Sequence, residues 1–295
     1  MTAEQVARAF ELSCIIEVMA PKPGNVTRYQ DFHDTTCEDF LISAWAAAPV
    51  FAKAGELSVG DIILAARQAS SRFTLANTNL GIILLLAPLA KAALYVTPTE
   101  VSLRQRLHNV LKTLTVDDCS KAYMAIRAAK PGGLGKIEKH DVRDEPNITL
   151  LDAMHLAKDR DGIAFEYSSD YHITFTLGYP ALLKAMQEAP CWTLAVVQAF
   201  LTILAEVPDT LIARKLGIEK AREVSKKAGE VLEAGRPGSR EWNEARADLD
   251  LYLRGDNNRL NPGTTADLIT ASLFVLFLEK GYEAFLSKGM VAWPE

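Results

Sequence analysis

The chain has 295 residues, of which 49% are hydrophobic and 23% charged, and these values exclude a wholly disordered or low-complexity protein. The formal net charge is -5, and no run of Lys and Arg is dense enough to follow a phosphate backbone, so we expect no nucleic-acid partner. The four cysteines form no CxxC pair, which argues against a zinc site or a disulfide scaffold and favours buried free thiols. They are Cys14, Cys37, Cys119 and Cys191.

The first residues predict neither a secretion signal nor a membrane anchor. The chain begins MTAEQVARAFELS, with acidic residues where a secretory signal has a basic patch and an apolar core. The most apolar stretch, residues 81–94, contains Lys91 and is too short to span a bilayer. We therefore expect a cytoplasmic protein with no membrane partner.

Apolar residues follow a helical spacing through nearly the whole chain. Six helix starts are indicated by a hydroxyl side chain followed three residues later by Gln, Asp or Glu. They are Thr2 with Gln5, Thr36 with Asp39, Ser58 with Asp61, Thr97 with Glu100, Thr115 with Asp118 and Thr149 with Asp152. Pro49 is expected to stop or kink the helix that follows Thr36. Further amphipathic helices are predicted near residues 191–206, 219–234, 239–254 and 265–279.

One segment predicts a central helix. Residues 81–94 are apolar on all sides and are expected to be buried. Only residues 171–175 alternate like a strand, and a single strand has no partner. No flexible linker divides the chain, and the common nucleotide and hydrolase signatures are missing. We therefore predict an all-α fold, with a single compact multi-helix domain over residues 1–295 around the buried helix.

A rigid loop follows the first helix. Residues 21–26 read PKPGNV, in which two prolines fix φ and Gly24 permits close backbone approach. Such a loop can present Lys22 and the backbone around Gly24 and Asn25 to a phosphate. A plain helix terminator with a solvated lysine explains the same residues.

Acidic residues and a histidine lie beside this loop. Glu17 ends an apolar stripe of the first helix, where a carboxylate is costly unless it is paired or bound to a cation. It could be a metal ligand or a base, or it could pair with Lys22 or Arg28. A divalent ion could be bound, or a base oriented, by Asp31, His33 and Asp34.

Two glycine-containing segments could bind anions. The first, from Asn77 to Gly81, precedes the apolar helix, whose N-terminus offers free N–H groups. Helix capping alone also explains its polar residues. The second contains Gly133 and Gly135 within a long irregular stretch, where glycines permit a backbone cradle around phosphate. A flexible loop without a ligand is the alternative.

Charged residues farther along the chain are candidates for the same site. Asp141 follows the second glycine segment and could hold a metal ion. Asp209 is followed by Arg214 and Lys215, two cations that could neutralise phosphate charge. Taken singly, Asp209, Arg214 and Lys215 are better explained as solvated surface groups, and a flexible loop without a ligand is the alternative for Asp141.

The last long helix opens with a further motif. Residues 261–268 read NPGTTADL, and Thr264 with Asp267 has the spacing of a capping box. The same segment offers a glycine, Gly263, and two hydroxyls, those of Thr264 and Thr265, at a helix start that could bind an anion.

These motifs occur in a fixed order along the chain. They are Glu17, Pro21-Lys22-Pro23-Gly24-Asn25-Val26, Asp31-Phe32-His33, Asn77-Thr78 with Gly81, and Asn261-Pro262-Gly263-Thr264-Thr265-Ala266-Asp267-Leu268. Together they resemble the triphosphoribosyl-dephospho-CoA synthase family, from about residue 10 to residue 280. The resemblance implies an all-helical enzyme.

The activity that the resemblance implies is a glycosyl transfer. The 5-triphosphoribosyl group of ATP moves to the 2′-hydroxyl of dephospho-CoA and adenine is released, in the biosynthesis of a prosthetic group. A carboxylate would stabilise the oxocarbenium-like state or take the hydroxyl proton, and Mg²⁺ would screen the triphosphate. The catalytic candidates are Glu17, Asp31 and His33. The phosphate-binding candidates are Lys22, Arg214, Thr264 and Thr265, and the metal candidates are Asp209 and Asp267.

The second motif departs from the family pattern Asn-Thr-His-Lys-Gly. Asn79 and Leu80 stand where the family has His and Lys, so two cationic groups are missing. This departure leaves open a phosphoribosyl transferase that uses another activated ribose, such as phosphoribosyl pyrophosphate, and another hydroxyl acceptor, such as a pterin-type cofactor precursor. A third possibility is a non-catalytic nucleotide-binding homologue, against which the clustered acids argue.

Overall fold

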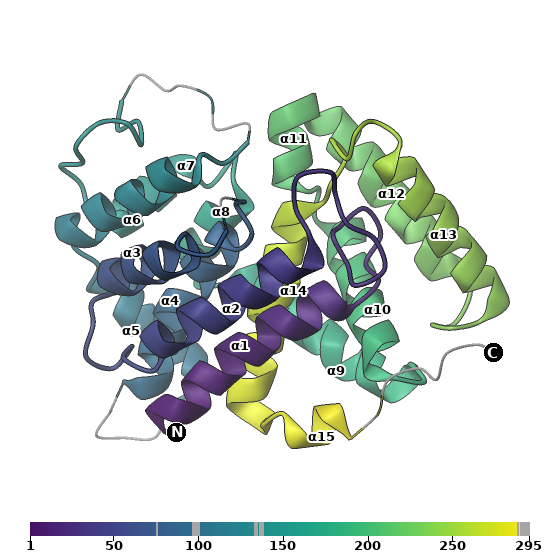
Figure 1. Cartoon of the computed structure of the whole chain (residues 1–295), viewed down its shortest axis with the longest axis horizontal. Helices are drawn as coiled ribbons and strands as arrows, with labels where there is room; N and C mark the ends of the chain where they lie inside the picture. The colour runs from purple at the N-terminus through teal and green to yellow at the C-terminus, as the bar shows by residue number, and fades with distance from the viewer. Residues whose placement is uncertain (75, 96–100, 133–134, 136–138, 288, 290–295) are drawn as a thin grey trace. The chain divides into compact units, whose positions relative to one another are not determined.

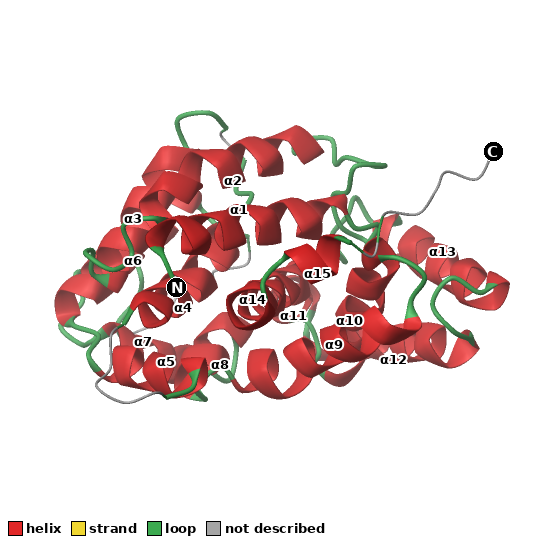
Figure 2. Cartoon of the chain, turned by 90° about the horizontal axis from the view of Figure 1, so that it is seen from below, coloured by secondary structure: helices red, strands yellow, loops and turns green. Residues whose placement is uncertain are grey.

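The chain folds almost entirely into helices in the computed structural model (Figures 1 and 2). The structure describes all residues except 75, 96–100, 133–134, 136–138, 288 and 290–295. Within the described residues there are fifteen α-helices and one short π-helix, and no strand. The predicted all-α fold is therefore confirmed.

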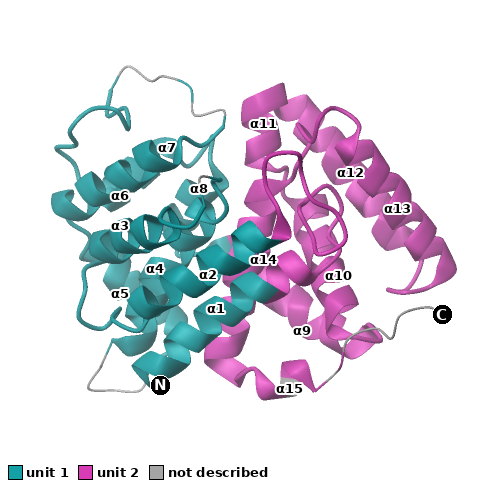
Figure 3. Ribbon diagram, in the orientation of Figure 1, with its two compact units in different colours: residues 1–15, 38–172 teal, residues 16–37, 173–295 magenta. Residues whose placement is uncertain are grey.

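Contacts between residues divide the chain into two compact units (Figure 3). Unit 1 comprises residues 1–15 and 38–172, and unit 2 comprises residues 16–37 and 173–295. The first helix, α1 (Ala3–Met19), therefore contributes to both. The single domain over residues 1–295 stays a prediction.

Unit 1 contains the helices that the local start signals predict. Thr115 and Asp118 form a complete capping box, and the side chains of Thr2, Ser58 and Thr149 each accept the backbone N–H three residues later. The pair Thr97 with Glu100 lies outside the described residues. Besides the start of α1, the helices are α2 (Cys37–Phe51), α3 (Val59–Ser70), α4 (Leu80–Leu94), α5 (Leu103–Lys112), α6 (Val116–Ala129), α7 (Leu150–Ala157) and α8 (Gly162–Ser168).

The predicted central helix, α4, is the buried helix of unit 1. Twelve of its 15 residues are buried. Pro88 lies inside it and lacks the N–H that would bond to the carbonyl of Leu84. The hydroxyl of Tyr167 donates to that carbonyl at 2.7 Å instead. A tyrosine of α8 thus replaces the hydrogen bond that the proline removes.

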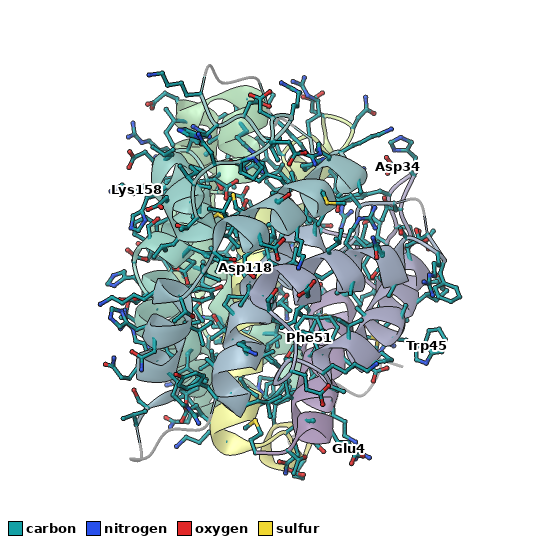
Figure 4. The ribbon with its side chains drawn as sticks, turned by 90° about the vertical axis from the view of Figure 1, so that its left-hand side faces the viewer. Glu4, Asp34, Trp45, Phe51, Asp118 and Lys158 are labelled. Atoms are coloured by element: carbon teal, nitrogen blue, oxygen red, sulfur yellow. The ribbon has the colours of Figure 1, made fainter. Side chains whose placement is uncertain are left out.

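Pro49 does not stop α2, which continues to Phe51. Of the stop or kink expected at Pro49, the stop is wrong, and the residues that follow Pro49 are held by packing. Phe51 is fully buried and its ring stacks on that of Phe10 at 3.7 Å between centroids. On the outside of α2, Trp45 projects from the surface (Figure 4) and meets the edge of the exposed Phe73 ring.

Helices α3 and α6 are joined by a buried carboxylate, Asp118. Its Oδ1 accepts the N–H of Gly60 at 2.7 Å, and its Oδ2 accepts from the N–H and hydroxyl of Thr115. Burial raises the pKa of Asp118, but these hydrogen bonds outweigh burial and lower it below its ordinary value. A Cβ at Gly60 would collide with the Asp118 backbone, so only glycine allows this approach.

Unit 2 is built on α14, which buries 14 of its 18 residues and contacts α9, α10, α11 and η1. Residues 171–175, which alternate like a strand in sequence, form no strand, and the last two of them begin the π-helix η1. A Cβ at Gly178 of η1 would collide with Ser272 of α14, which accounts for the close packing. The elements are η1 (Thr174–Gly178), α9 (Tyr179–Glu188), α10 (Trp192–Glu206), α11 (Thr210–Leu216), α12 (Ile218–Ala234), α13 (Arg240–Arg254), α14 (Gly263–Lys280) and α15 (Glu283–Leu286).

All four cysteines are free and buried, as the sequence predicts. None of the described helices is by itself long and apolar enough to cross a membrane. Only α10 and α11 taken together, with a bend of 52° between them, reach the length and apolar composition of a span.

Candidate functional site

The best-defined group of predicted site residues lies in unit 2, where α1 ends and the PKPGNV loop begins. Lys22 is fully buried, and its Nζ lies 3.0 Å from Oε1 of Glu17, which is 3% exposed. The same Nζ also donates to the main-chain carbonyl of Glu17 and, at 3.4 Å, to that of Ala20. Of the partners considered for Glu17, the structure selects Lys22.

Burial and charge act in opposite directions on this pair. Burial raises the pKa of Glu17 and lowers the pKa of Lys22, and the charge of each partner opposes the shift of the other. Both groups are therefore displaced toward their neutral forms. A buried carboxyl with a raised pKa beside an ammonium is suited to accept or pass a proton.

The loop that carries Lys22 is fixed by residues from the C-terminal part of the chain. The N–H of Gly24 donates to Oδ1 of Asp250 at 2.7 Å, and the guanidinium of Arg254 donates to the carbonyl of Asn25 at 2.6 Å. Nδ2 of Asn261 donates to the carbonyl of Gly24 and to Oδ1 of Asn25, both at 3.1 Å. The predicted rigid loop is thus held by α13 and by the start of the NPGTTADL motif.

Gly24 itself cannot be replaced by a larger residue without strain. Its φ is +75°, and a Cβ there would lie 2.8 Å from Cβ of Leu253 and 3.1 Å from Pro262. The loop therefore needs glycine for its conformation and for its close contact with α13.

The sequence interpretation missed Asp250 and Arg254. A usable signal is present, since Arg246, Asp250 and Arg254 recur every four residues and therefore share one face of α13. Nothing local shows that this face contacts a loop more than 220 residues earlier in the chain.

A second polar centre joins the starts of α11 and α14. Oδ1 of Asp209 accepts the N–H groups of Leu211 and Ile212, and its Oδ2 accepts the N–H and hydroxyl of Thr265 at 2.7 and 2.9 Å. Burial raises the pKa of Asp209, against the effect of these bonds and of Arg214. A single carboxylate therefore faces the positive ends of two helices.

This arrangement corrects the capping box predicted for α14. The helix begins at Gly263, one residue before Thr264, with Pro262 at the N-cap and no side-chain cap. Thr264 lies inside the helix and accepts a hydrogen bond from the hydroxyl of Thr210 at 3.1 Å. The local spacing misled because Thr264 is already inside the helix and its hydroxyl bonds to Thr210 at the start of α11.

Cations lie close to this centre. Arg214 and Lys215 occupy the last turn of α11 and are half-buried. Burial lowers the pKa of Lys215; Asp209 and Asp34 raise it, while Arg214 and Arg259 lower it further. Asp267, in the second turn of α14, is also half-buried.

The predicted Asp-His segment is at the surface of unit 2. Oδ1 of Asp31 accepts the N–H of Cys37 at 2.8 Å, which fixes the carboxylate at the start of α2. The side chain of His33 is 78% exposed, and its Nε2 lies 3.9 Å from Asp34.

The remaining predicted residues belong to unit 1. Asn77 is exposed, and Gly81 is the second residue of α4. Gly135 and Asp141 are linked by Arg143, which donates to the carbonyl of Gly135 at 2.8 Å and lies 3.4 Å from Oδ2 of Asp141. Gly133 lies outside the described residues. The candidates Glu17, Lys22, Asp31, His33 and Asp267 all belong to unit 2.

The described part of the chain contains no group of three or more His, Cys, Asp or Glu side chains that could form a metal cage. Asp209 is already engaged by four hydrogen bonds from protein groups. Mg²⁺ commonly uses only one or two carboxylates together with substrate phosphates. The carboxylates of the described residues therefore fit an ion that is also bound by a triphosphate better than an ion that is bound by the protein alone.

The comparisons with known proteins agree with the sequence resemblance. No curated protein matches the chain significantly. A solved structure from Archaeoglobus fulgidus, named as a triphosphoribosyl-dephospho-CoA synthase, is 26% identical with a TM-score of 0.64. The similarity covers 81% of this chain and 99% of that one. Residues 3–285 match the family of ATP:dephospho-CoA triphosphoribosyl transferases. The chain therefore belongs to the ATP:dephospho-CoA triphosphoribosyl transferase family and is a transferase of that reaction.

Proposed function

We propose that this chain carries out the transfer at the PKPGNV loop of unit 2, with Glu17 and Lys22 as its proton-handling pair. The observation that carries the proposal is their buried ion pair, 3.0 Å apart, within the part of the chain that matches the family. Glu17 takes the proton of the attacking hydroxyl, and Lys22 holds the carboxylate in place. Asp31 and His33, on the following segment, contact the ribose or the acceptor as it binds.

The transfer exchanges one bond at C1′ of the ribose for another. The acceptor hydroxyl oxygen forms a bond to C1′ of the ribose while the bond from C1′ to adenine breaks. Adenine leaves with the electron pair of that bond and takes up a proton. The proton lost by the hydroxyl passes to Glu17, whose raised pKa makes it a stronger base than an ordinary carboxylate.

Phosphate binding is assigned to cations and helix starts of the same unit. Arg214 and Lys215 are near Asp209 at the end of α11, and Gly263 and Thr264 open α14. Mg²⁺ bound together with ATP would screen the triphosphate charge, and Asp267, in the second turn of α14, would be its carboxylate contact. Because ATP and the acceptor are intracellular metabolites, we propose a cytoplasmic location.

The other substrates left open by the departure at Leu80 have no support from the family match, which names ATP and dephospho-CoA. In our proposal, Arg214 and Lys215 of unit 2 supply positive charge for the phosphates in place of the family lysine that is missing at this position. Phosphoribosyl pyrophosphate, a pterin-type acceptor and a non-catalytic role are therefore the alternatives that an assay must exclude.

A chromatographic assay tests the function. The purified protein is incubated with ATP, Mg²⁺ and dephospho-CoA, and we expect adenine to appear only when all three are present. Glu17→Gln should abolish the release. ADP or inorganic phosphate as the product would indicate phosphoryl transfer, and pyrophosphate released from phosphoribosyl pyrophosphate would select the other donor; either result contradicts the proposal.

A further inference from the structure

One face of α13 holds the PKPGNV loop through three charged residues. Nη1 of Arg246 donates to the carbonyl of Pro21 at 3.2 Å, Asp250 accepts from Gly24, and Arg254 donates to Asn25. The three side chains are spaced four residues apart, which places them on one side of the helix. The contacts therefore follow the loop from its first residue to its fifth.

Asp250 and Arg254 also bind each other. Nε of Arg254 lies 2.9 and 3.0 Å from the two carboxylate oxygens of Asp250, and the Arg254 side chain is only 10% exposed. The planar guanidinium can donate to the carboxylate and to the Asn25 carbonyl at the same time and in a fixed geometry. A lysine ammonium, on its flexible stem, does not fix the geometry of two such bonds.

We propose that Asp250 and Arg254 are positioning residues for the transfer reaction, which hold Gly24 and Asn25 so that the buried Glu17–Lys22 pair keeps its reactive arrangement. This inference rests on the proposed function of that pair. Neither residue needs to contact substrate, because both act through the loop. A displacement of about 1 Å in a reacting group can lower a rate by about 100-fold.

Arg254 acts on Lys22 through charge as well as through the loop. The ionisable groups that act on Lys22 are Glu17 and Cys37, which favour its charged form, and Arg254, which disfavours it. Removal of the Arg254 charge should therefore raise the pKa of Lys22. A lysine at position 254 keeps the charge and loses the fork, so the two effects can be separated.

The test compares Arg254→Lys and Arg254→Gln with a matched control on the same helix. The control is Arg240→Lys, because Arg240 forms an exposed ion pair with Glu244, with side chains 84% and 62% exposed. We expect both Arg254 variants to lower kcat for adenine release by about 100-fold with little change in KM. Only Arg254→Gln should shift the alkaline limb of the pH profile upward, and Arg240→Lys should match the wild type.

Hydrogen–deuterium exchange of residues 22–26 gives a readout that does not depend on activity. The Gly24 amide, which donates to Asp250, should exchange faster in Arg254→Lys than in the wild type. Its exchange rate in Arg240→Lys should equal that of the wild type. Asp250→Asn keeps an oxygen that can accept from Gly24 but loses the charge that binds Arg254, so it should lower kcat even if an Arg254 variant folds poorly.

The outcomes separate the two proposals. Wild-type kcat in Arg254→Lys, or unchanged exchange of the loop, overturns the positioning role while the proposed function stands. Absence of adenine release from the wild type overturns the proposed function, and the link between the loop and catalysis is then lost even if exchange increases. If kcat falls in the Arg254 and Asp250 variants only in proportion to their melting temperatures, both residues stabilise the fold and have no positioning role.

Discussion

Glu17 and Lys22 form an ion pair of 3.0 Å in which neither side chain has contact with solvent beyond a few per cent of its surface. The pair closes the end of α1 onto the loop that follows it. Two charges removed from water attract each other strongly, but each becomes a liability when the other is absent.

Loss of one partner should therefore destabilise the fold more than loss of both. We expect Lys22→Met to lower the free energy of unfolding by about 3–5 kcal/mol, because it leaves Glu17 buried and uncompensated. The double variant Glu17→Gln with Lys22→Met should recover part of that loss. Urea unfolding of the wild type, both single variants and the double variant measures the coupling, and additive effects would contradict it.

Gly24 should tolerate no side chain. Gly24→Ala places a Cβ 2.8 Å from Leu253 at a φ of +75°, so we expect a loss of stability and of transfer activity. Gly229 is the matched control, because it lies inside α12 and a Cβ there meets no atom within 4 Å. Gly229→Ala should keep activity and raise the free energy of unfolding by up to about 1 kcal/mol. Thermal melts and the adenine assay compare the two, and a neutral Gly24→Ala would argue against the fixed loop.

The contact between Asp209 and Thr265 should be cooperative. Asp209→Ala leaves several buried N–H groups without an acceptor, and we expect it to lower the free energy of unfolding by about 1–3 kcal/mol or more. Thr265→Val should cost less, and the double variant less than the sum of the two by at least about 0.5 kcal/mol. If Asp209 instead binds a metal ion, chelation should lower the melting temperature of the wild type and not of Asp209→Asn.

Acid should remove the contribution of Asp118 in unit 1. Its folded pKa is below the ordinary value of 3.8, so the ionised form stabilises the fold above that pH. The stabilisation is lost as the pH falls from 3.8 through the folded pKa, because the unfolded chain then binds the proton first. Melting temperatures of the wild type and Asp118→Asn should differ at pH 7 and converge as the pH falls below 3.8 through the folded pKa. A constant difference would show that the charge has no part in the contact.

The parts of the fold that depend on neighbours in sequence could be predicted. The hydroxyl of Thr115 and the carboxylate of Asp118 recognise each other within one turn, so their spacing is enough to place α6. The apolar run of α4 likewise needs no knowledge of its partners to indicate burial.

The parts that depend on distant partners could not be predicted. The spacing of Thr264 and Asp267 satisfied a local rule, but Thr264 lies inside α14 and its hydroxyl bonds to Thr210, 54 residues away. Asp250 and Arg254 lie on an amphipathic helix of ordinary composition, and their role exists only because the loop at Gly24 and Asn25 packs on them. A sequence motif identified the loop as a site, but not what holds it.

The hydrogen bond from Tyr167 to Leu84 also has a consequence for synthesis of the protein. The two residues are 83 positions apart, so at a translation rate of about 5–20 residues per second α4 waits roughly 4–17 s for its missing donor. During that interval the newly made apolar helix has a carbonyl that only water can satisfy, and its surface is unprotected. We expect the nascent chain to be most prone to aggregation, and most dependent on chaperones, between the emergence of α4 and that of α8.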